Sequence, residues 1–170
     1  MNRRIILITG GTRSGKSSMA EKMALSLSPN PIYLATARIW DEEFRQRVLR
    51  HQQNRGPQWT NIEEDKQLSL HDCSGRVVLV DCLTLWCTNF FFDLNANVEQ
   101  ALTAAREEFD RFTAQQATFL FVTNEIGSGG VSTDEVQRKF TDLQGWMNQY
   151  IASRADEVYL MVSGLPLRIK

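Results

Sequence analysis

The chain has 170 residues, of which 42% are hydrophobic and 23% charged, and its formal net charge is −1. This length and composition are typical of a globular domain with a full core, and they argue against a disordered chain. The near-neutral charge gives no global electrostatic reason to expect binding to nucleic acid or to an anionic membrane. Any phosphate ligand therefore needs a local site, and we expect residues 1–170 to form a single domain.

The chain also lacks the sequence features of a membrane or secreted protein. No apolar run approaches the roughly 18 residues of a membrane-spanning helix. The basic start at Arg3 and Arg4 precedes an apolar stretch that is too short for a secretory signal. The cysteines are odd in number and have no Cys-x-x-Cys spacing, which indicates reduced thiols. We expect a cytoplasmic protein.

Short apolar runs alternate with longer helical patterns along the chain, which favours βα units. Strands are predicted at Arg4–Thr9, Pro31–Thr36, Arg76–Asp81, Thr118–Thr123 and Glu157–Val162, with a short last strand near Leu167–Lys170. Helices are predicted at Lys16–Ser28, Asp41–Asn54, Val98–Gln116 and Thr133–Arg154. The strands are apolar without alternation, as in a sheet covered on both sides. The expected fold is α/β, a mostly parallel sheet with helices on both faces.

A glycine-rich segment, Gly10–Ser17, joins the first strand to the first helix and reads GGTRSGKS. Its spacing matches the Walker A pattern of P-loop proteins in the required strand–loop–helix setting. Gly10 and Gly15 permit a close backbone approach, and the successive amides then form an anion site at the helix N-terminus. Lys16 is expected to contact the outer phosphates and Ser17 to ligate Mg²⁺. The segment predicts a nucleotide triphosphate site.

The second predicted helix carries an unusual stripe of basic side chains. Arg47, His51 and Arg55 are spaced at i, i+4 and i+8, although Arg55 lies just past the predicted helix end. Such a stripe is either a solvated face or a face turned toward a polyphosphate, where a neutral imidazole serves as a nucleophile between phosphate-binding arginines. The residues alone leave both interpretations open. His71 lies in a polar connection and is expected at the surface.

Two acidic residues follow apolar strands. Asp81 ends the run Val77–Val80, and Glu125 follows the strand that ends near Thr123. Open α/β sheets bind their ligands at the carboxyl ends of the strands, so both are expected near the P-loop. Asp81 is a candidate metal-site carboxylate, with a turn cap as the alternative. Glu125 is a candidate for metal binding, substrate binding or general base catalysis.

These motifs together resemble one family, the bifunctional adenosylcobinamide kinase / adenosylcobinamide-phosphate guanylyltransferases of cobalamin biosynthesis. The resemblance runs from about residue 5 to the C-terminus, with the motifs in the family's order. The matching segments are Gly10–Ser17, Tyr33–Ala37, Arg47–Arg55 with Trp59 and Glu63, Asp81–Trp86 with Thr88 and Asn89, Thr123–Gly127 and Val162–Pro166.

The resemblance implies a RecA-like P-loop fold and two reactions on a corrinoid. The γ-phosphate of ATP or GTP passes to the aminopropanol hydroxyl of adenosylcobinamide. GTP then guanylylates a histidine with loss of pyrophosphate, and the new substrate phosphate takes the GMP to give adenosylcobinamide-GDP. By position, His51 is that histidine. The resemblance also suggests a homo-oligomer, specifically a trimer.

The resemblance further implies which residues bind the nucleotide and Mg²⁺. The expected nucleotide contacts are Gly10, Gly11, Thr12, Arg13, Ser14, Gly15, Lys16, Ser17, Ala35, Thr36, Ala37, Gln52, Gln53, Asn54, Arg55, Glu63 and Asp81. Ser17 and Asp81 are the expected metal ligands, and His51 and Lys16 the expected catalytic residues. The alternatives are a P-loop small-molecule kinase or NTPase without a covalent histidine intermediate, and a non-catalytic nucleotide-gated regulator.

Overall fold

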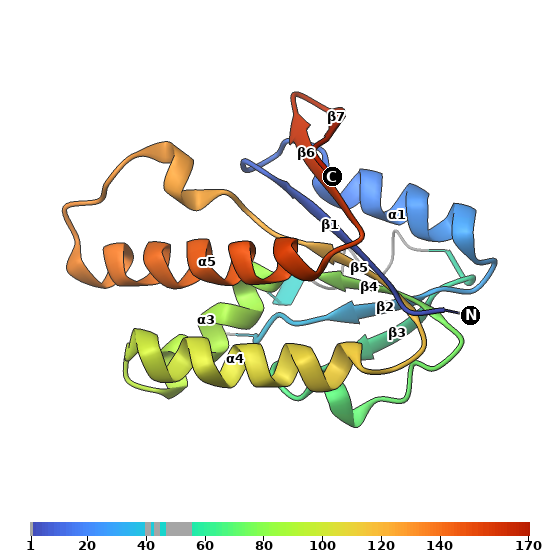
Figure 1. Ribbon diagram of the computed structural model, residues 1–170, viewed down its shortest axis with the longest axis horizontal. Helices are drawn as coiled ribbons and strands as arrows, with labels where there is room; N and C mark the ends of the chain where they lie inside the picture. The colour runs from blue at the N-terminus through green and yellow to red at the C-terminus, as the bar shows by residue number, and fades with distance from the viewer. Residues whose placement is uncertain (1, 40–41, 43–44, 47–55) are drawn as a thin grey trace.

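The computed structural model describes residues 2–39, 42, 45–46 and 56–170, and Figure 1 shows their arrangement. Within these residues a seven-stranded sheet has the order β3-β2-β4-β5-β1-β6-β7. Its strands are β1 (Arg4–Gly10), β2 (Ile32–Ala35), β3 (Thr60–Glu63), β4 (Val77–Asp81), β5 (Thr118–Val122), β6 (Glu157–Val162) and β7 (Leu165–Arg168). Neighbouring strands run parallel except for the antiparallel β6–β7 hairpin.

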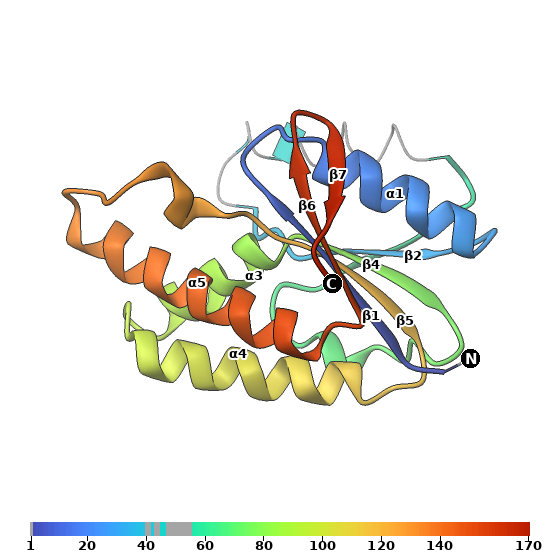
Figure 2. The same cartoon turned by 45° about the horizontal axis from the view of Figure 1, so that its top comes forward.

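Helices cover both faces of the sheet, as Figure 2 shows. Helix α1 (Lys16–Leu27) lies on one face, and α3 (Leu83–Asp93), α4 (Val98–Thr113) and α5 (Glu135–Arg154) lie on the other. Short 3-10 turns, η1 (Leu68–Leu70) and η2 (Ile126–Gly129), lie in the connections. The expected mostly parallel α/β sheet, covered on both faces, is confirmed.

Two apolar cores account for this layering, and β1 supplies side chains to both. Ile5 and Leu7 pack in the core beneath α3, α4 and α5, whereas Ile6 and Ile8 pack beneath α1. Successive strand residues point to opposite faces, so an unbroken apolar run fills both cores. The core on the α3–α5 face is rich in aromatic rings, such as Phe119, whose centroid lies 4.9 Å from that of Phe112.

The sequence patterns miss two elements, α3 and β3. Helix α3 buries Leu83, Trp86 and Phe91, and it has apolar residues around most of its circumference, so no amphipathic stripe marks it. Strand β3 is short and polar, and it pairs with β2 alone among the described strands. Both elements form because of their tertiary neighbours.

Several predicted boundaries also shift. The helix predicted from Thr133 begins at Glu135, because the Asp134 side chain caps it by accepting from the Gln137 amide at 2.7 Å. The last strand begins at Leu165, ahead of the predicted Leu167. Most of the helix predicted at Asp41–Asn54 lies outside the described residues; Glu42, Arg45 and Gln46 are described and helical. None of the helices in the described part of the chain is long and apolar enough to cross a membrane.

Candidate functional site

The carboxyl ends of the parallel strands meet at one edge of the sheet. One row of paired residues crosses the sheet at this level, so β3, β2, β4, β5 and β1 end at about the same height in the sheet. The pairs are Glu63–Ala35, Ala35–Asp81, Asp81–Val122 and Val122–Ile8. The P-loop begins two residues beyond Ile8, and Glu125 lies three residues beyond Val122. The row therefore places the described site residues of β2, β3, β4 and β5 at the edge of the sheet where the P-loop begins, with β5 next to β1.

The P-loop is packed tightly against the β6–β7 hairpin. Gly10 has φ 149°, and a Cβ atom there would lie 2.6 Å from the Met161 carbonyl oxygen. Gly15 has φ 94°, and its Cβ would lie 3.2 Å from the Gly164 Cα. The Gly164 amide donates to the Ser14 carbonyl at 3.0 Å. Glycine is required at both loop positions by backbone conformation and close approach.

Lys16 is the first residue of α1, and its side chain folds into the loop. The Nζ atom donates to the Gly11 carbonyl, and its distance to the Ser14 Oγ is 3.5 Å. Burial lowers the pKa of Lys16, while the negative charge of the Asp81 carboxylate acts to raise it. The ammonium group therefore interacts electrostatically with the carboxylate at the end of β4. Ser17, the next residue, is half-buried at the same helix N-terminus.

Asp81 is held at the end of β4 by Tyr33, the first residue of the segment Tyr33–Ala37. Its Oδ2 atom accepts a hydrogen bond of 2.9 Å from the Tyr33 hydroxyl on β2. The Thr36 hydroxyl donates to the Cys82 carbonyl at 2.7 Å, which fixes the chain leaving both strands. Burial raises the pKa of the Cys82 thiol to about 11, so this thiol is neutral near pH 7.

The chemistry of Ser17 and Asp81 fits a nucleotide-bound Mg²⁺. A hydroxyl and a carboxylate are hard oxygen ligands, and Mg²⁺ is usually held by one or two carboxylates together with substrate phosphates and water. The described residues contain no group of three or more His, Cys, Asp or Glu side chains that could hold a metal ion. A Mg²⁺ ion at these residues would therefore depend on phosphate oxygens for much of its coordination.

Glu125 lies beside the P-loop at the end of β5. Its amide donates to the Gly10 carbonyl at 3.2 Å, and its Oε1 accepts from the Thr9 hydroxyl at 2.6 Å. The Asn148 amide group lies 3.4 Å from the same oxygen. Thr9 and Asn148 are not among the residues that the sequence motifs point to. The available signal was the pair Gln144 and Asn148, two amides at i and i+4 among the apolar residues of α5.

Comparison with known proteins agrees with this arrangement. Residues 6–169 match the family described as cobinamide kinase / cobinamide phosphate guanyltransferase. The chain is 38% identical over 169 residues to the bifunctional adenosylcobalamin biosynthesis protein CobP of Pseudomonas aeruginosa, covering 96% of each chain. It is 35% identical over 181 residues to CobU of Escherichia coli K12, covering 98% of this chain and 99% of that one. The chain belongs to this family.

Solved structures of other proteins share the fold of this family member. An ATPase of the type III secretion system of pathogenic bacteria superposes with a TM-score of 0.56 at 11% identity, covering 94% of this chain and 51% of that one. The flagellar accessory protein FlaH of Methanocaldococcus jannaschii gives 0.51 at 14% identity, covering 99% and 79%. At such identities the likeness concerns the fold alone, and it confirms the RecA-like P-loop expectation.

Part of the nucleotide site expected for a family member is outside the described residues. These residues are Arg47, His51 and the stretch Gln52–Arg55. Glu63 is described and lies exposed at the end of β3. The other histidine, His71, is half-exposed, and its Nε2 lies 3.5 Å from Glu64 Oε2. This partial exposure agrees with the expected location of His71 at the surface.

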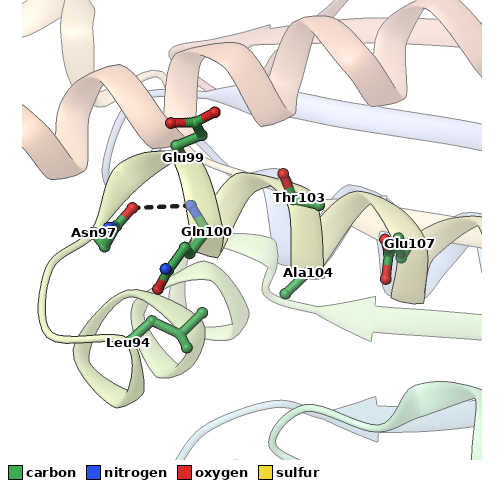
Figure 3. Close-up of a pocket in the computed structure, with 7 residues that line it drawn as sticks. All are labelled: Leu94, Asn97, Glu99, Gln100, Thr103, Ala104 and Glu107. Atoms are coloured by element: carbon green, nitrogen blue, oxygen red, sulfur yellow. Dashed lines mark hydrogen bonds between the residues drawn. The ribbon is translucent and has the colours of Figure 1, made fainter.

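A surface hollow lies apart from these residues, at the end of α3 and along α4 (Figure 3). Its lining residues are Leu94, Asn97, Glu99, Gln100, Thr103, Ala104 and Glu107. Asn97 Oδ1 accepts from the Gln100 amide at 3.0 Å, which caps the helix, as the dashed line in Figure 3 shows. None of the predicted site residues lines this hollow, so it gives no reason to move the site from the strand ends.

Proposed function

We propose that the P-loop edge of the sheet serves both reactions of this family in cobalamin biosynthesis. One is transfer of the γ-phosphate of ATP or GTP to the hydroxyl of adenosylcobinamide. The other is transfer of GMP from GTP to adenosylcobinamide phosphate. The observation that carries the proposal is the family match over residues 6–169, which spans the whole Gly10–Ser17 cradle and the aligned strand ends.

In the kinase reaction, the substrate hydroxyl oxygen bonds to the γ-phosphorus and the bond to the β–γ bridging oxygen breaks. The P-loop amides and the Lys16 ammonium hold the outer phosphates and offset their charge. A Mg²⁺ ion held by Ser17, Asp81 and the phosphates would add further charge neutralisation. Ala35, Thr36, Ala37 and Glu63 would contact the nucleotide from the neighbouring strand ends.

In the guanylyl reaction, a neutral imidazole nitrogen of His51 attacks the α-phosphorus of GTP. The bond to the α–β bridging oxygen breaks, and pyrophosphate leaves with the electron pair. A phosphate oxygen of adenosylcobinamide phosphate then attacks the same phosphorus and releases the histidine. Arg47 and the stretch Gln52–Arg55 would bind phosphate oxygens next to the nucleophile.

The remaining predictions concern the surroundings of the enzyme. We expect a cytoplasmic protein that takes a corrinoid and nucleotides as its partners and binds no nucleic acid. We also expect a homo-oligomer, with a trimer suggested by the family resemblance. Sedimentation equilibrium with and without GTP would measure the number of copies, and a monomer under both conditions would contradict the expected assembly.

A covalent label tests the histidine mechanism. The protein is incubated with GTP labelled at the α-phosphate, denatured, and assayed for bound label. We expect wild-type protein to carry a label that is stable in alkali and lost in acid, as a phosphorus–nitrogen bond requires. His51→Ala should carry none and should retain much of its kinase activity.

The matched control is His71→Ala, which removes the other histidine of the chain. This variant should be labelled like the wild type. If wild-type protein forms adenosylcobinamide-GDP without ever becoming labelled, the covalent mechanism is wrong. If the label persists in His51→Ala and vanishes in His71→Ala, the nucleophile has been assigned to the wrong histidine.

A further inference from the structure

A buried polar network ties the end of β5 to α5. The Thr123 hydroxyl donates to Asn148 Oδ1 at 2.7 Å, and the Gln144 amide group donates to both, at 2.8 Å and 2.9 Å. Thr123 and Gln144 are fully buried, and Asn148 is 7% exposed. Three hydrogen bonds fix these side chains relative to one another, since buried polar groups are stabilised by such bonds. Gln144 Oε1 is buried without a hydrogen-bond partner among the described residues.

Within this unit, Asn148 is the residue that contacts the carboxylate of Glu125. The Asn148 amide group donates to the Asn124 carbonyl at 3.1 Å and lies 3.4 Å from Glu125 Oε1. The Thr9 hydroxyl donates to the same Oε1 atom at 2.6 Å. No described residue donates to the other oxygen, Oε2, and no described cation forms an ion pair with Glu125. Oε1 is therefore anchored from strand β1 and from helix α5, while Oε2 is available to a ligand.

The place of β5 in the sheet puts this carboxylate beside the phosphates. Strand β5 lies between β1, which leads into the P-loop, and β4, which ends at Asp81. The Glu125 amide is bonded to the carbonyl of Gly10, the first residue of the loop. A carboxylate next to a polyphosphate is electrostatically unfavourable, so it needs a compensating cation or a proton to accept.

Resting on the function proposed above, we propose that Glu125 is the general base of the kinase reaction. Its Oε2 atom accepts the proton of the substrate hydroxyl as the hydroxyl oxygen bonds to the γ-phosphorus. The bond to the β–γ bridging oxygen breaks, and the nucleoside diphosphate leaves with that electron pair. The hydrogen bonds to Oε1 hold the carboxylate in one orientation while Oε2 takes the proton.

The bifunctional chemistry limits this role to one reaction. Phosphorylation uses a neutral hydroxyl, which must lose a proton to form a stable product. Guanylylation of a histidine uses the lone pair of a neutral imidazole, and the final transfer uses an ionised phosphate oxygen. Neither of those nucleophiles has a hydroxyl proton for Glu125 to remove, so the guanylyl reactions serve as an internal control.

The test is to measure the two reactions separately in Glu125→Gln. Glutamine keeps the size of the side chain and an oxygen that accepts from Thr9, but it cannot take a proton. We expect kcat for adenosylcobinamide phosphorylation to fall by about 10²- to 10⁴-fold, with little change in the KM for nucleotide. Labelling by α-labelled GTP and guanylylation of supplied adenosylcobinamide phosphate should stay at the wild-type level.

Two further variants separate base catalysis from a structural effect. Glu157→Gln removes a carboxylate that is 8% exposed at the start of β6 and bonded to Arg4 and Tyr159, and it should leave both reactions unchanged. Glu125→Asp keeps a carboxylate but shortens its reach by one methylene, and it should retain more kinase activity than Glu125→Gln.

Three outcomes would overturn the inference. Parallel loss of both reactions in Glu125→Gln would assign the residue to nucleotide or metal binding. Unchanged phosphorylation in that variant would exclude it from the chemistry. If the wild-type protein forms no phosphorylated corrinoid, the proposed kinase function fails and this inference fails with it. Wild-type phosphorylation with an active Glu125→Gln would leave the proposed function standing and reject only the base.

Discussion

The two sides of the candidate site are built from different parts of the chain. On the P-loop side, backbone contacts set the shape, because Gly10 and Gly15 lie too close to the β6–β7 hairpin to carry side chains freely. On the β5 side, side-chain hydrogen bonds from Thr9 and Asn148 set the position of Glu125. The backbone contacts on the P-loop side tolerate little change in side-chain size. The side-chain hydrogen bonds on the β5 side can be removed one at a time by mutation.

The two sides of the site also differ in the reactions that they serve. Both reactions need a triphosphate held in the cradle, whereas only phosphorylation needs a base for a hydroxyl. Damage on the P-loop side should therefore lower both activities together, and damage on the β5 side should separate them.

Removing the P-loop lysine should have the largest effect. Lys16→Ala deletes the one charged P-loop side chain that is buried against the Gly11 carbonyl, and both reactions should fall by roughly 100- to 1,000-fold. Steady-state assays of each reaction with saturating corrinoid measure this loss. Lys22→Ala, an exposed lysine on the same helix, is the control and should change neither rate. Full kinase activity in Lys16→Ala would contradict a shared cradle.

Adding a methyl group to the loop should have a smaller effect that also reaches both reactions. A Cβ atom at Gly10 would lie 2.6 Å from the Met161 carbonyl oxygen, so the loop or the hairpin must shift. We expect Gly10→Ala to lose about 1–3 kcal/mol of unfolding free energy and to bind nucleotide about tenfold or more weakly. Thermal unfolding should show a drop of about 2–4 °C for each kcal/mol.

Gly129→Ala is the matched control for that experiment, since a Cβ atom there has nothing within 4 Å. Its melting temperature and nucleotide affinity should stay near those of the wild type. A Gly10→Ala protein with unchanged nucleotide affinity would show that the close approach to Met161 is not what shapes the cradle. The P-loop would then accommodate a methyl group at Gly10 without losing its shape.

Elements that are set by local sequence patterns could be predicted from the sequence, and elements that depend on tertiary contacts could not. The P-loop and the core strands are marked by local patterns, since apolar runs such as Ile5–Ile8 and the Walker A spacing lie within a few residues. Helix α3 and strand β3 carry no such local mark. Leu83 and Trp86 are helical because α4, α5 and the sheet surround them, and Thr60–Glu63 forms a strand because β2 offers an edge.

The candidate site likewise combines residues that local patterns mark with hydrogen-bond partners that they do not. Asp81 and Glu125 could be proposed as site residues because each follows an apolar strand. The bond from Tyr33 to Asp81 and the bond from Thr9 to Glu125 join residues that are 48 and 116 positions apart in the chain. No local spacing encodes such pairs. The assignment of His51 stays a prediction from the sequence, since that residue lies outside the described part of the chain.

The smallest expected effect concerns the β5 side and uses two neighbouring amides of α5. Asn148→Leu removes a contact to Glu125 Oε1, whereas Gln144→Leu removes bonds to Thr123 and Asn148 and none to Glu125. Each should lower the unfolding free energy by about 1–3 kcal/mol, because buried bonds are lost. Only Asn148→Leu should lower kcat for phosphorylation, by about tenfold and at most about 100-fold, since a misplaced group reacts less often.

Labelling by α-labelled GTP should stay unchanged in both variants, since the cradle is intact. The pair thus separates an effect on stability from an effect on positioning. Both proteins lose buried hydrogen bonds, but only Asn148→Leu loses the contact that orients the Glu125 carboxylate. An equal fall in phosphorylation in the two variants would mean that the whole Thr123–Gln144–Asn148 unit positions the carboxylate. A fall in labelling that tracks the fall in phosphorylation would mean that the β5 side also shapes the cradle, and the two sides of the site would then act as one.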